Sequence, residues 1–167
     1  VQRDAGDQVD QLAQHHLVER WPCIVLGQNT LERLVVLLDG THRVIDSSEC
    51  LIENQVAKAI IQSVRQLMPK LRIEPYDEDA DAGFLRHAQV RVGHASGEVM
   101  VTLVTRDEAF PAGKRLAREL VRRHPQITTV VQNVNTRRTN VIMGDKERTI
   151  YGPGFILDEL CGLSFRI

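Results

Sequence analysis

The fold is decided by one stretch of the sequence, Gly83-Phe84-Leu85-Arg86-His87-Ala88-Gln89-Val90-Arg91-Val92. Apolar and polar side chains alternate along its second half, and so fall on opposite faces of an extended chain. The two sets are Ala88, Val90 and Val92, and His87, Gln89 and Arg91. Such alternation is typical of a half-buried antiparallel strand, so we expect a strand over residues 84–92 and a partner over 98–105.

Two helices are predicted around this pair of strands. The first runs from about Cys50 to Met68, because apolar residues recur there at spacings of three and four and form one buried stripe. Ser47 and Ser48 offer N-caps, and Pro69 is expected to end the helix. The second helix follows Pro111, which suits a first turn. Its apolar residues and its arginines separate into two sets: Leu116, Ala117, Leu120 and Val121 on a buried side, and Arg115, Arg118, Arg122 and Arg123 on an exposed side.

More strands are expected towards the end of the chain. Residues 127–134 and 139–143 would pair across the turn Asn135-Thr136-Arg137-Arg138, and shorter strands would follow at 149–151, 155–157 and 163–167. The order helix–strand–strand occurs twice. This order predicts an α+β fold, with an antiparallel or mixed sheet and two main helices packed on one of its faces.

Composition limits the class of protein. The 167 residues are 43% hydrophobic and 26% charged, as in a globular domain, and no apolar run approaches the length of a membrane span. The first residues lack the pattern of a signal peptide, so we expect a cytoplasmic protein without a membrane partner. Cys23, Cys50 and Cys161 are far apart, which argues against a disulfide framework, so no disulfide partner is expected. Cys161 lies among apolar residues and is expected to be a buried thiol.

The formal net charge of −1 conceals an asymmetry along the chain. Residues 1–82 hold 8 Lys/Arg against 14 Asp/Glu, whereas residues 83–167 hold 13 against 8. A basic second half suits an anionic partner such as RNA, although a solvated surface explains the same excess. The candidate RNA-facing side chains are Arg86, His87, Gln89, Arg91, Arg137 and Arg138, and the arginine forks among them match phosphate geometry. The candidate readers of unpaired bases are the amides Gln132, Asn133 and Asn135, for which an Asn-favoured turn is the alternative.

Three further motifs occur in the second half of the chain, at residues 131–135 (Val-Gln-Asn-Val-Asn), 139–144 (Thr-Asn-Val-Ile-Met-Gly) and 162–167 (Gly-Leu-Ser-Phe-Arg-Ile). Together with Gly83–Val92 they resemble the central domain of the SAM-dependent RNA (uracil-5-)-methyltransferases, in particular the branch that acts on 23S ribosomal RNA. The resemblance covers roughly Gly40 to Ile167. It implies ribosomal RNA as partner and SAM as cofactor of the parent enzyme.

Methylation of uracil C5 needs a reactive cysteine, a carboxylate base and a glycine-bearing site for SAM. The chain shows no Gly-x-Gly-x-x-Gly after a strand, and Gly152-Pro153-Gly154 is typical of a turn. The family's cysteine stretch has no counterpart either. The resemblance therefore implies a fragment that helps to position RNA, and we expect no catalytic residues and no methyl transfer by the chain alone.

The segment that ends at Cys50 resembles the family's segment for the fourth cysteine ligand of a [4Fe–4S] cluster. One thiolate cannot hold a cluster, so the resemblance implies this role for Cys50 only in an intact parent protein. Residues 1–39 do not match the family. We expect an irregular or non-native segment over 1–39 and the family's central domain over 40–167.

Two alternatives to the enzyme fragment remain open from the sequence. One is a stand-alone RNA-binding or adaptor domain that has lost catalysis. The other is a structural remnant without activity. Salt-dependent RNA binding would separate the enzyme fragment and the RNA-binding domain from the structural remnant.

Overall fold

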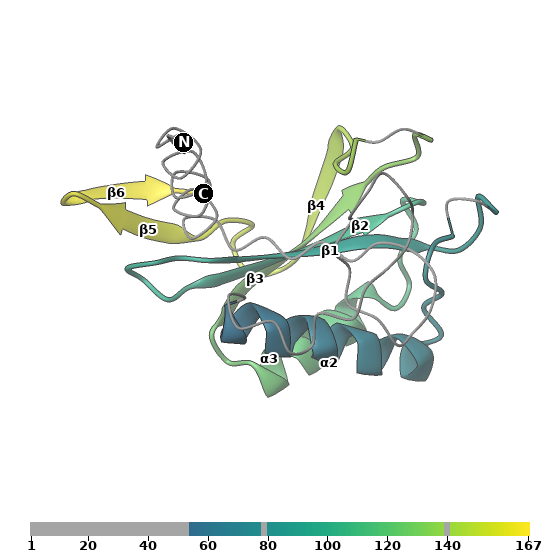
Figure 1. Ribbon diagram of the computed structural model, residues 1–167, viewed down its shortest axis with the longest axis horizontal. Helices are drawn as coiled ribbons and strands as arrows, with labels where there is room; N and C mark the ends of the chain where they lie inside the picture. Colours follow the sequence, from purple (N-terminus) through teal and green to yellow (C-terminus); the bar gives the residue numbers. More distant parts are fainter. Residues whose placement is uncertain (1–53, 78–79, 139–140) are drawn as a thin grey trace, which may run out of the picture.

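The computed structural model describes residues 54–77, 80–138 and 141–167. The chain forms two layers, with two helices beneath a four-stranded sheet and a small hairpin at one end (Figure 1). In chain order the elements are α2 (Gln55–Leu71), β1 (Leu85–Val92), β2 (Val99–Thr105), α3 (Gly113–Arg123), β3 (Ile127–Val134), β4 (Lys146–Tyr151), β5 (Leu157–Leu160) and β6 (Leu163–Arg166). The predicted α+β fold with two helices on one face of the sheet is confirmed.

The main sheet is mixed and has the order β1-β2-β3-β4. β1 pairs with β2 in antiparallel fashion, and Val90 lies opposite Val101. β2 and β3 are parallel, with Val101 opposite Val130, so the chain must cross over between them. α3 is that crossover, and this connection fixes it against the sheet.

The main core lies between the helices and the sheet. Ile60 and Val64 of α2, Leu116 of α3 and Leu103 of β2 are all fully buried there. The predicted helical stripes therefore face the sheet. Ala88 and Val90 also point into this core, which confirms the inner face assigned to β1.

α2 differs from its prediction at both ends. Asn54 caps it, because its Oδ1 accepts from the N–H groups of Val56 at 3.0 Å and Ala57 at 3.2 Å. Residues 47–53, which include the predicted caps, lie outside the described residues. Pro69 does not end the helix. It lies in the last turn, and the chain leaves at Arg72, which adopts a left-handed conformation with φ of 54°.

The predicted pairing of 127–134 with 139–143 is wrong. β3 has the predicted bounds, but its antiparallel partner is β4, and Val134 lies opposite Lys146. Residues 141–144 have no regular structure. The chain between the strands is a loop rather than a short turn, because the buried amides of Asn133 on β3 and Asn135 just after it bind its backbone and hold it outside the ladder.

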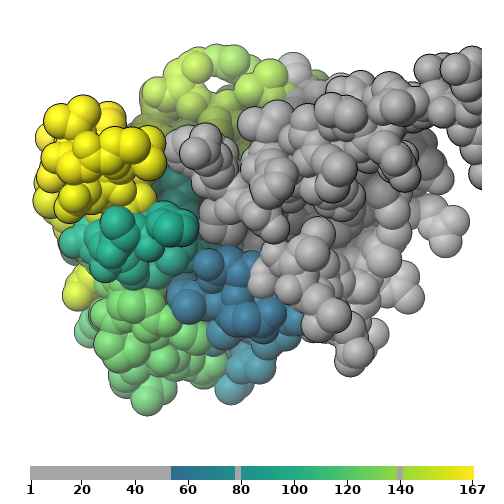
Figure 2. Space-filling model, turned by 60° about the vertical axis from the view of Figure 1, so that its left-hand side comes forward, coloured from purple at the N-terminus to yellow at the C-terminus, as the bar shows by residue number. Residues whose placement is uncertain are grey.

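The small hairpin of β5 and β6 packs on the face of the sheet opposite the helices. Ile156, just before β5, is buried against Met100 and Val131, and it exchanges backbone hydrogen bonds with Ile167. Figure 2 shows the yellow hairpin against the teal loop that joins β1 and β2. Cys161 occupies the hairpin turn with φ of 53° and is exposed, so the predicted burial of this thiol is wrong.

Neither α2 nor α3, the two helices in the described part of the chain, is long and apolar enough to cross a lipid bilayer.

Candidate nucleic-acid interface

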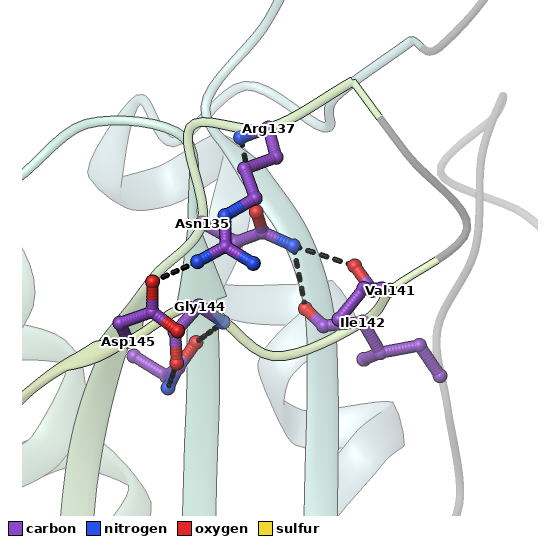
Figure 3. Close-up of polar contacts among 7 residues, drawn as sticks. Asn135, Arg137, Val141, Ile142, Gly144 and Asp145 are labelled. Atoms are coloured by element: carbon purple, nitrogen blue, oxygen red, sulfur yellow. Dashed lines mark hydrogen bonds and ion pairs between the residues drawn. The ribbon is translucent and has the colours of Figure 1, made fainter.

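Asn135 organises the loop between β3 and β4. Its side-chain amide donates to the carbonyl oxygens of Val141 at 2.6 Å and Ile142 at 3.0 Å, and its Oδ1 accepts from the N–H of Arg137 at 3.0 Å (Figure 3). The residue is 1% exposed. Since all these bonds are made within the protein, the amide holds the loop and is not presented to a base.

Asn133 fixes the other end of the same loop. Its amide donates to the carbonyl of Gly144 at 3.0 Å, and its Oδ1 accepts from the N–H of Gly144 at 2.7 Å. The side chain thus pairs with the backbone as a neighbouring strand would. A Cβ at position 144 would overlap the carbonyl oxygen of Val134, so only glycine permits this close approach.

Gln132 is also buried, but it stabilises a different segment. Its Nε2 donates to Thr105 Oγ1 at 2.8 Å and to the carbonyls of Asp107 and Glu108 at 3.1 and 3.2 Å. Its Oε1 accepts from Arg148 on β4 at 2.6 Å. These bonds fix the chain that leads into α3. All three amides predicted to read bases are therefore engaged in the protein interior.

Arg86 is buried as well, which corrects its assignment to the exposed face of β1. It is the extra residue of a bulge between Leu85 and His87, and a bulge changes the direction of a side chain. Its Nη1 donates to the carbonyls of Asn135 at 2.9 Å and Arg137 at 2.5 Å. Its guanidinium also lies 4.7 Å from the centre of the Tyr76 ring. Arg86 thus ties β1 to the loop.

The other predicted RNA-facing side chains are more accessible. Arg137 and Arg138 are exposed on the loop, beside the exposed apolar residues Val141 and Ile142. Arg137 also forms an ion pair with Asp145 (Figure 3). On β1, the three polar residues of the outer face are half-buried. They are His87, Gln89 and Arg91.

A contact that the sequence does not predict anchors the β5–β6 hairpin to the loop between β1 and β2. The Asp158 carboxylate accepts from the N–H groups of His94 and Ala95, each at 2.9 Å, and from Ser96 at 3.2 Å. Burial raises the pKa of Asp158, but the hydrogen bonds from these backbone donors outweigh that effect and bring the pKa down to about 2. No sequence motif marks this contact, because its partners lie more than 60 residues apart.

We expect Asp158→Asn to loosen this anchor. A folded pKa below the ordinary carboxyl value of about 3.9 means that the carboxylate stabilises the fold above about pH 4, and that this is lost as the pH falls through about 2. At pH 7, the variant should exchange the amide hydrogens of His94, Ala95 and Ser96 on the order of tenfold faster, as measured by hydrogen exchange. The exposed neighbour Glu159→Gln serves as control. Equal exchange in both variants would contradict the assignment.

One of the two sequence features considered for cofactor binding lies among the described residues. Gly152-Pro153-Gly154 forms a turn, with φ of 76° and 87° at its two glycines, and no helix follows it to form a SAM site. Among the described residues, no group of His, Cys, Asp and Glu could hold a metal ion. Cys50 lies outside them, so its iron–sulfur role stays a prediction.

Comparison with known proteins gives three close likenesses in bacteria. The chain is 40% identical over 129 residues to an uncharacterized RNA methyltransferase of Halalkalibacterium halodurans. The matched stretch covers 77% of this chain and 28% of that protein. Uncharacterized RNA methyltransferases of Oceanobacillus iheyensis and Listeria monocytogenes are 38% and 39% identical over 128 and 127 residues. These matches cover 76% of this chain, and the chain again spans 28% of each relative's length. No family model matches.

A solved structure has the same fold. It is the tRNA (uracil-54, C5)-methyltransferase of Pyrococcus abyssi in complex with S-adenosyl-L-homocysteine, with a TM-score of 0.71 and 22% identity. The match covers 89% of this chain and 35% of that chain. These likenesses support a relationship between this chain and the RNA methyltransferases.

Proposed function

We propose that this chain is the central part of a SAM-dependent RNA (uracil-5-)-methyltransferase of the 23S ribosomal RNA branch. Its role is to position the RNA for methylation. The observation that carries the proposal is the 40% identity over 129 residues to a bacterial RNA methyltransferase. In this proposal residues 40–167 form one structural unit, and residues 1–39 are not native to it.

The chemistry itself is assigned to other parts of the enzyme. SAM supplies the methyl group when bound, and a cysteine activates the uracil ring. Cys161, the one cysteine among the described residues, is exposed on a hairpin turn. The residues of this chain therefore bind and orient RNA rather than react with it.

Support for this role comes from the loop after β3, which carries exposed cations and whose described backbone is bound by buried side chains. Asn133 and Asn135 bind the backbone of Arg137, Val141, Ile142 and Gly144. Arg86 binds the carbonyls of Asn135 and Arg137. Arg137 and Arg138 are exposed on this fixed base, where Arg137 would exchange its ion pair with Asp145 for a phosphate. A fixed base lowers the entropic cost of ordering the arginines against a phosphate.

The test is a binding titration of the whole chain with transcripts that cover 23S ribosomal RNA, with a tRNA transcript for comparison. We expect binding to the ribosomal transcripts that weakens steeply as the salt concentration rises. The same samples, given radiolabelled SAM, should show no methyl transfer. Absence of RNA binding at low salt, or methylation by the chain unaided, would contradict the proposal. Preference for the tRNA would contradict the 23S assignment.

A further inference from the structure

The two helices carry an unusual excess of positive charge. α2 contains Lys58, Arg65 and Lys70 and has no acidic residue, and α3 contains Lys114, Arg115, Arg118, Arg122 and Arg123 beside a single Glu119. Eight cations against one acid give these two helices a formal charge of +7. Outside them, the described residues hold nine Lys/Arg against ten Asp/Glu, or −1. The positive charge is therefore confined to one layer of the fold.

The cations of α3 form a stripe on its outer surface. Lys114, Arg118 and Arg122 recur every four residues and are exposed, whereas Leu116 and Leu120 are buried against the sheet. At a rise of 1.5 Å per residue the stripe is about 12 Å long. Measured along the axis of a B-form double helix, one strand carries a phosphate about every 3.4 Å, so a stripe of this length faces more than one phosphate.

Stability of the helix does not explain this pattern. Cations at the C-terminal end, such as Arg122 and Arg123, interact favourably with the helix dipole. Lys114 and Arg115 lie in the first turn of α3, where the dipole favours acidic residues, and that turn contains none. Glu119 is paired with Arg122 at 2.8 Å. Within the described ranges, no ion pair involves Lys114, Arg115 or Arg118.

The surface is continuous across both helices. Arg123 donates to Gln66 of α2 at 3.2 Å, and Ser63 of α2 is 2.7 Å from Nε2 of His124 at the end of α3. Figure 2 shows the blue α2 and the green α3 next to each other on the lower part of the molecule. Lys70 adds an exposed cation on α2. A polyanion can therefore contact both helices at once.

We propose that the outer surface of α2 and α3 binds the phosphate backbone of RNA. This inference rests on the proposed function and deepens it, because it assigns the RNA to the helical layer as well as to the loop after β3. Charge complementarity selects the partner. Arginine forks match phosphate geometry, and phosphate contacts supply most of the affinity of non-specific RNA binding.

The experiment compares two pairs of substitutions of equal charge in the whole chain. Arg115→Gln with Arg118→Gln removes two exposed cations from α3. Lys146→Gln with Arg166→Gln removes two exposed cations from β4 and β6, outside the two helices. Urea midpoints should stay close to that of the unmodified chain for both, since all four side chains are exposed. Binding to a 23S ribosomal RNA transcript is then measured between about 50 and 200 mM salt.

We expect the α3 pair to weaken binding roughly tenfold and to reduce the salt slope by about 1.4, that is about 0.7 for each phosphate contact. The control pair should stay within about twofold. Equal weakening by both pairs, or no change from the α3 pair, would overturn the inference. If Arg137→Gln with Arg138→Gln alone weakens binding, the helical surface is excluded while the proposed function stands. If the unmodified chain binds no RNA, the proposed function itself fails.

Discussion

Asn135→Ala is expected to lower the free energy of unfolding by about 3 kcal/mol, because a buried amide that makes three hydrogen bonds is removed. The carbonyls of Val141 and Ile142 and the N–H of Arg137 lose their partner. Released from these bonds, the loop between β3 and β4 should also exchange its amide hydrogens faster. Urea denaturation followed by circular dichroism gives the free energy, and hydrogen exchange gives the local effect.

The matched control is Asn135→Asp, which has nearly the same shape. It keeps an acceptor for the N–H of Arg137 but cannot donate to the two carbonyls when ionised. We expect it to be at least as destabilising as the alanine variant at pH 7, because a carboxylate would then face two carbonyl oxygens. A loss below about 0.5 kcal/mol in both variants, the size of an ordinary surface substitution, would contradict the role given to Asn135.

Arg86→Ala is expected to cost about 3 kcal/mol as well. Its guanidinium donates to two backbone carbonyls and stacks over Tyr76, and the residue is 4% exposed. Hydrogen bonds from a charged group contribute about 1.5–3 kcal/mol each, and partial solvation of the vacated carbonyls reduces the total. Chemical denaturation measures the loss. Arg86→Lys should recover only part of it, since an ammonium cannot reproduce the planar fork.

The same variants distinguish a structural Arg86 from an RNA ligand. If Arg86 contacts RNA, as the sequence predicted, Arg86→Lys would weaken RNA binding at an unchanged unfolding midpoint. We expect instead that Arg86→Lys lowers the unfolding midpoint and changes RNA binding little while the protein remains folded. Normal stability with lost RNA binding would restore the original assignment.

The elements of the fold that depend on simple periodicity could be predicted. Alternation identified β1, and the spacing of apolar residues identified the inner faces of α2 and α3. β3 was predicted with its observed bounds. These patterns succeed because burial of one face is a local property of a strand or helix, and it is readable at a period of two or about 3.6 residues.

The candidate site was less predictable, because its polar residues bind the protein itself. Asn133 and Asn135 belong to the Val-Gln-Asn-Val-Asn motif at residues 131–135, and their amide side chains are of the kind that reads unpaired bases. In the structure they bind the backbone of residues 141–144. A side chain that satisfies a distant carbonyl has no periodic signature. The same reason explains why Asp158, which caps a loop more than 60 residues away, was missed.

The charge of the helical layer was missed for another reason. The charge of each half of the sequence does not show it, because α2 lies in the acidic half and α3 in the basic half. The structure brings the two helices together on one face of the sheet (Figure 1). The predicted first helix, from about Cys50 to Met68, also includes Glu53 and leaves out Lys70, whereas the observed α2 begins at Gln55 and contains no acid.

We propose that this chain holds RNA through α3 and the loop after β3. Ultraviolet cross-linking of the whole chain to a 23S ribosomal RNA transcript, followed by mass spectrometry of the linked peptides, tests it most directly. We predict cross-links in peptides from α3 and from the loop after β3. Cross-links confined to β5 and β6, or none above the level of a chain denatured before irradiation, would contradict the account.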